Sequence, residues 1–154
     1  MTGIYDIVNT VKTHLRNHPI VNTVTFGDIT EIDLNKTTMF PLAHFLLQDT
    51  TVFSNNIQIT LSLLFVDITS KNNDFNADDL GGRETSDNLV DVYNTQLQIA
   101  NDLITELRRG DLYSDKYQLI GDPVCTPFED RFENQLAGWS VDLTIAIPNN
   151  ISVC

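Results

Sequence analysis

Residues 86–109 read SDNLVDVYNTQLQIANDLITELRR and form the longest helical pattern in the chain. The apolar residues recur at spacings of three and four, which places them on one stripe of an α-helix. The stripe consists of Leu89, Val92, Tyr93, Ile99, Ala100, Leu103, Ile104 and Leu107. Polar residues inside the helix fall off this stripe, and Gln96 is the exception. Thr85–Asp87 can cap the start, and Gly110 is a typical residue just past the end.

The remaining pattern predicts a second, shorter helix over residues 3–17, which His18-Pro19 ends. Alternating or β-branched runs predict strands, and these cover residues 21–26, 40–47, 57–69, 117–120, 128–136 and 139–147. A turn at Asn55-Asn56 predicts that strands 40–47 and 57–69 pair as an antiparallel hairpin. Pro41 favours the start of a strand or an edge strand, because proline has no N–H to donate to a ladder.

This order predicts one α+β domain over residues 1–154: an antiparallel sheet with one long and one shorter helix packed on one face. The stripe of the long helix is expected to lie on the sheet face that contains Ile59, Leu61, Val141 and Leu143. Residues 30–36 fit either a helical turn or an irregular strand.

The chain is strongly acidic, with a net charge of −12 from 21 acids and 9 bases. Such a surface repels phosphate, so a role in neutralising nucleic acid is disfavoured. The two cysteines, Cys125 and Cys154, make no disulfide framework and suit a reducing compartment. The longest apolar run is too short to span a bilayer. These features predict a protein made in a cytoplasm, with no membrane contact.

Residues 70–85 form the longest polar stretch, which we interpret as a functional loop between the hairpin and the long helix. Asp74, Asn76, Asp78 and Asp79 give it a faint likeness to a calcium loop. The sixth position of that motif requires glycine and is Asp79, and the twelfth is Thr85 in place of glutamate. We therefore expect a solvated acidic loop and no metal or other cofactor.

Three histidines are the only other candidates for chemistry. His14 and His18 lie four residues apart, so they share one helix face, but no acid or cysteine partner is evident near them in the sequence. We interpret them as cations at a helix C-terminus. His44 lies in a predicted strand with no nucleophile motif around it, and is more consistent with a packed or surface histidine than with a catalytic base.

Three stretches carry a family resemblance: MFPLAH at residues 39–44, PFEDRF at 127–132 and LAGWSVDL at 136–143. Together with the order of elements, they resemble the tail terminator, or tail completion, proteins of tailed bacteriophages. The first and third stretches are most similar to small virion proteins from phages of Bacteroidetes hosts, including the crAss-like group.

The resemblance implies a non-enzymatic structural protein of the virion, assembled in the host bacterial cytoplasm. Such proteins form a closed homo-oligomeric ring, six-fold or twelve-fold, at the neck between the portal or connector and the tail. They end tail growth or join head to tail, and they contact neighbouring portal, connector or tail rings. Genomic DNA would pass through the ring without specific binding, which agrees with an acidic channel wall that does not hold phosphate. The family has no catalytic residues.

Subunit contacts in such a ring are heterologous. From the polar stretch we expect Phe75, Leu80 and Arg83 to reach a neighbouring subunit. The aromatic and charged segment after residue 127 is a second candidate, and its interface residues are Phe128, Asp130, Arg131 and Glu133. Two alternatives remain open: a small cytoplasmic binding module without enzymatic activity, and, with less support, a small enzyme that uses His44.

Overall fold

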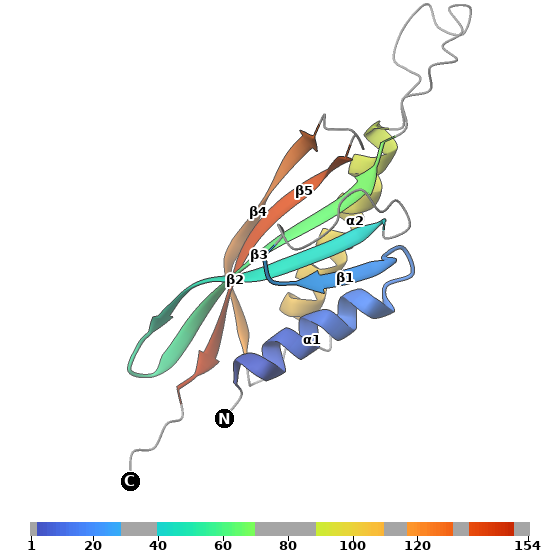
Figure 1. Cartoon of the computed structure of the whole chain (residues 1–154). Coiled ribbons are helices and arrows are strands. Elements are labelled where there is room, and N and C mark those ends of the chain that lie inside the picture. Colours follow the sequence, from blue (N-terminus) through green and yellow to red (C-terminus); the bar gives the residue numbers. More distant parts are fainter. Residues whose placement is uncertain (1–2, 29–39, 70–88, 110–116, 131–135, 150–154) are drawn as a thin grey trace, which may run out of the picture.

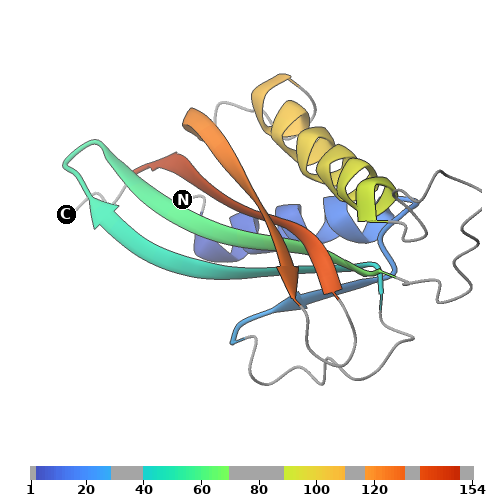
Figure 2. The same cartoon turned by 90° about the horizontal axis from the view of Figure 1, so that it is seen from above.

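The structure is a computed structural model, and it describes residues 3–28, 40–69, 89–109, 117–130 and 136–149. Two helices lie on the same side of a five-stranded sheet (Figures 1 and 2). The helices are α1 (Ile4–Asn17) and α2 (Leu89–Arg109). The strands are β1 (Thr23–Phe26), β2 (Leu42–Val52), β3 (Asn56–Ile68), β4 (Gln118–Asp130) and β5 (Leu136–Pro148). The predicted α+β class and the placement of both helices on one face are therefore confirmed.

The strand order is β1-β2-β3-β5-β4, and the sheet is open. The predicted β2–β3 hairpin is present, and β3 also pairs with β5 along its whole length in antiparallel register. One expectation was wrong: β1 pairs with β2 in parallel, so the sheet is mixed and not purely antiparallel. This parallel pair forms because α1 leads into β1 from the helical side of the sheet, and Asn22 and Thr23 N–H groups then bond to the Pro41 carbonyl.

The strand that precedes β5 also differs from expectation. Residues 117–120 and 128–136 were predicted as separate segments, because Gly121-Asp122-Pro123 reads as a break. In the structure β4 runs through that break as one strand, and the register with β5 shifts between Ile120 and Val124. Gly121 adopts a φ of 70°, a conformation that glycine allows, so the irregularity is absorbed as a bulge.

The core lies between the two helices and the inner face of the sheet. Leu103 is 1% exposed and shares one cluster with Ile59, Leu61, Val141 and Leu143, as the sequence predicted. Ile7, Val11 and Leu15 of α1, spaced by four, complete the same cluster. Trp139 fixes α2 to β5: its indole N–H donates to the Tyr93 carbonyl at 2.8 Å, and the two rings meet edge to face.

Several expectations fall on residues that the structure does not describe. These are the polar stretch 70–85 with its calcium-like acids, the cap residues before Leu89, and residues 30–36. None of the helices within the described ranges is long and apolar enough to cross a membrane.

Candidate functional site

The C-terminus of α1 is joined to α2 by a histidine–carboxylate pair. His18 is the C-cap residue of α1, and its Nδ1 accepts a hydrogen bond from the Ile20 N–H at 3.2 Å. A nitrogen that accepts cannot carry a proton, so the proton lies on Nε2, which donates to Asp102 Oδ2 at 2.8 Å. The His18 side chain is 8% exposed and that of Asp102 42%. His18 therefore orients α1 against α2.

His14 lies one turn earlier in α1, beside Glu106, which is one turn after Asp102 in α2. Burial lowers the pKa of His14, and the negative charge of Glu106 opposes that shift. His14 Nε2 is buried and has no hydrogen-bond partner among the described residues. The histidine pair thus meets an acid pair of the same spacing, which the sequence analysis did not find because the acids come from a distant helix.

A polar groove of about 400 Å³ runs along these four side chains, and Asn17, Gln98 and Thr105 also line it. Histidine and carboxylate are ligand types for zinc. However, no three His, Cys, Asp or Glu side chains within the described part of the chain lie close enough together to hold a metal ion. His18 Nε2 donates its proton to Asp102 and so has no lone pair for a metal ion. The arrangement therefore fits a contact between helices better than a metal centre.

His44 lies on the opposite, outer face of the sheet, in β2. It is 2% exposed, and its Nδ1 is 2.8 Å from the Thr25 hydroxyl of β1. Burial lowers the pKa of His44, and its Nε2 has no hydrogen-bond partner among the described residues. Of the packed and surface positions that the sequence left open, His44 occupies the packed one, which gives a substrate no access to the imidazole.

The stretches at residues 39–44 and 136–143 meet on the sheet, although they are far apart in the sequence. Leu42 pairs with Val66, Val66 pairs with Gly138, and Gly138 pairs with Phe128, so the four residues form one row across β2, β3, β5 and β4. Phe40, Leu42, Val66 and Leu136 form a second buried cluster, with Phe128 packed against it. The quoted residues therefore specify how one end of the sheet is built.

Gly138 has a specific role in this row. A Cβ atom at position 138 would lie 1.7 Å from the carbonyl oxygen of Phe65, which belongs to the neighbouring strand backbone. Only glycine permits this approach, because the backbone of β3 has no freedom to move aside between its two partners. No local pattern around Gly138 indicates this requirement, because it depends on a neighbouring strand.

A groove of about 630 Å³ lies between α2 and β4. It is lined by Asn94, Leu97, Gln98, Asn101, Ile104, Arg108, Asp122, Pro123 and Cys125. Arg108 closes one end: its guanidinium donates to Asp122 Oδ1 at 2.6 Å and to the Gly121 carbonyl at 3.3 Å. The other lining side chains are primary amides and apolar groups, a composition suited to binding an uncharged polypeptide surface.

Of the residues expected at an oligomer interface, only Phe128 has a described side chain. It is half-buried on the outer face of β4, and its carbonyl accepts from the Tyr93 hydroxyl at 3.2 Å. Phe75, Leu80, Arg83, Arg131 and Glu133 lie outside the described residues, as does the side chain of Asp130.

No protein-family model matches this sequence, and no curated protein matches it at a significant level.

Proposed function

We propose that this protein is the structural subunit of a closed ring at the neck-to-tail junction of a tailed bacteriophage. In this role it joins head to tail or ends tail growth, and it contacts portal, connector or tail rings above and below. The ring assembles in the host cytoplasm and becomes part of the virion.

The observation that carries the proposal is the structural role of residues 39–44 and 136–143, the two stretches most similar to small virion proteins of tailed phages. Both begin long strands at the same end of the sheet, and their residues supply a buried cluster, a backbone contact that requires glycine and a tryptophan that anchors α2. Residues in such roles specify a fold. Members of a structural family with low sequence similarity share their fold, so a resemblance at these residues supports membership of the family.

The titratable groups also support a structural role. His18 and Asp102 are paired between helices, and His44 is buried beside a threonine. General acid–base catalysis needs such a group within hydrogen-bond reach of a substrate, which neither histidine offers in this arrangement.

Oligomeric state tests the proposal directly. Purified protein is measured by light scattering over a wide concentration range and imaged by negative-stain electron microscopy. We expect closed rings of six or twelve copies with a central channel, and no retention of duplex DNA at physiological salt, because the chain carries a net charge of −12. A monomer at every concentration, with no rings in the images, would contradict the proposal.

A second candidate is a binding module that uses the groove between α2 and β4. The volume of about 630 Å³ favours it, since ligand sites span roughly 300–1,000 Å³. A protein that stays monomeric but protects Cys125 from alkylation when a ligand is added would favour this candidate over the ring.

A further inference from the structure

The β2–β3 hairpin extends beyond both helices (Figures 1 and 2). Its tip carries exposed apolar side chains. At its tip Val52 is 68% exposed and Phe53 47%. The turn is held by three hydrogen bonds. The Phe53 N–H donates to the Asn56 carbonyl at 2.8 Å, the backbone N–H of Asn149 donates to the Asn55 carbonyl, and the side-chain amide of Asn149 donates to the Phe53 carbonyl. The tip is therefore a preformed apolar projection, and exposed apolar groups of this kind mark interaction sites.

The absence of charge near the tip indicates which kind of surface the tip can contact. No charged residue occurs between Thr50 and Val66, although the chain has a net charge of −12. This net negative charge makes a contact between two copies costly wherever acidic surfaces meet, because like charges repel. An uncharged projection is a surface that can approach another copy without that penalty.

The groove between α2 and β4 is the matching surface. Among the described residues that line it, the charged ones are Arg108 and Asp122, and they neutralise each other at 2.6 Å. Leu97 and Ile104 offer apolar contacts, and Asn94, Gln98 and Asn101 offer amides that both donate and accept hydrogen bonds. The turn residues Ser54 and Asn55 bring polar groups that such amides can bind.

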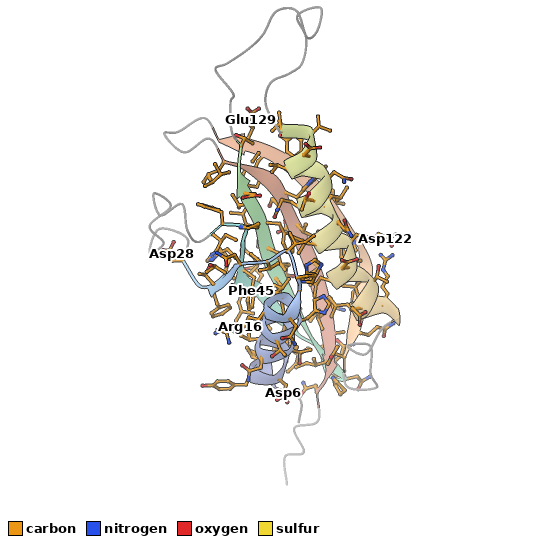
Figure 3. The ribbon with its side chains drawn as sticks, turned by 90° about the vertical axis from the view of Figure 1, so that its right-hand side faces the viewer. Asp6, Arg16, Asp28, Phe45, Asp122 and Glu129 are labelled. Carbon is orange, nitrogen blue, oxygen red and sulfur yellow. The ribbon has the colours of Figure 1, made fainter. Side chains whose placement is uncertain are left out.

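We infer that the β2–β3 tip, residues 52–55, docks into the α2–β4 groove of a neighbouring copy of this chain. The inference rests on the proposed homo-oligomer and names its contact. Figure 3 shows Asp122 beside α2 on the side away from α1. The tip joins β2 to β3, and β5 separates these strands from β4. Because tip and groove are different surfaces, the contact is heterologous and each copy can bind two neighbours, as a ring requires.

A disulfide test uses the native thiol in the groove. In a Cys154→Ser background Cys125 is the only cysteine, and Val52→Cys adds one at the tip. Concentrated protein is treated with a mild oxidant at pH 8.5 or above, since burial raises the pKa of the Cys125 thiol and the thiolate is the reactive form. A disulfide requires Cα atoms within about 7 Å, so bonding reports direct docking.

We expect a ladder of dimers, trimers and larger species on a non-reducing gel. The ladder should disappear when Cys125→Ser is added, and also when the new cysteine is placed at the exposed α1 residue Thr13 in place of Val52. Dimers that form without Cys125 would mean that tips pair with each other and would overturn the inference.

A charge test supports the same contact without new thiols. Phe53→Asp should weaken self-association at least tenfold in light scattering, whereas Thr13→Asp should leave it unchanged. Both variants should keep the circular dichroism spectrum of the parent protein, because both side chains are exposed.

The outcomes separate this inference from the proposed function. Rings without a Cys125-dependent ladder would leave the ring proposal standing and refute the docking contact. A Cys125-dependent ladder from open, non-closing chains would support the contact and refute the ring. Monomers with no ladder would refute both.

Discussion

Replacing Gly138 with alanine gives the sharpest test of how this sheet is built. The added Cβ would lie 1.7 Å from the Phe65 oxygen and 2.8 Å from the Phe65 carbonyl carbon, both of which are backbone atoms. Cβ contacts under 3.0 Å are essentially never found, so β3 and β5 would have to separate by about 1 Å or more.

That separation cannot be absorbed locally. Gly138 pairs with Val66 on one side and Phe128 on the other, so two ladders are disturbed. If two or three backbone hydrogen bonds are lost at about 1–1.5 kcal/mol each, the free energy of unfolding falls by roughly 2–4.5 kcal/mol. Disrupted packing of the neighbouring Phe65 and Trp139 in the core adds to this loss.

The assay is urea denaturation followed by tryptophan fluorescence. The matched control is Gly3→Ala, because Gly3 has a φ of −97° and nothing within 4 Å of the added Cβ. That control should change stability by no more than about 0.5 kcal/mol. A loss below about 1 kcal/mol for Gly138→Ala would refute the argument that the close approach to Phe65 requires glycine.

Three further predictions concern the core and the histidines. Leu103→Ala should lower the free energy of unfolding by about 2–5 kcal/mol in the same assay, because Leu103 is 1% exposed at the centre of the core; an unchanged midpoint would contradict its placement. Gln96→Leu should raise stability by about 1–3 kcal/mol, because Gln96 is fully buried and neither of its amide atoms has a hydrogen-bond partner among the described residues. Gln98→Leu is its exposed control and should have little effect on stability. Burial lowers the pKa of both His14 and His44 below the ordinary 6.5, so the unfolded chain takes up protons first as pH falls. Their stabilising contribution is complete above pH 6.5 and declines as pH drops from 6.5 toward the lowered pKa values. Unfolding curves between pH 7.5 and 5.5 should show this decline, and a variant with glutamine at both positions should show a flatter profile; an equally steep profile would assign the decline to other groups.

Local sequence patterns were sufficient to predict the helices and most of the strands. The stripe of α2, the spacing of Ile7, Val11 and Leu15 in α1, and the alternation in β3 and β5 each reflect which side of one element is buried. That information is local, because the period of the apolar residues follows directly from helix or strand geometry. The β2–β3 hairpin was equally readable, since the turn joins strands that are adjacent in the chain.

Features that depend on residues far apart in the chain could be recognised only from the folded structure. The parallel pairing of β1 with β2 depends on the position at which α1 leads into β1. The strand β4 continues through its glycine and proline because β5 pairs with it on both sides of the bulge. Asp102 became the partner of His18 across 84 residues, and the need for glycine at position 138 arises from a neighbouring strand. Local patterns indicate which face of a helix or strand is buried, but they do not indicate which other element packs against that face. The contacts described above all lie between elements that are distant in the sequence.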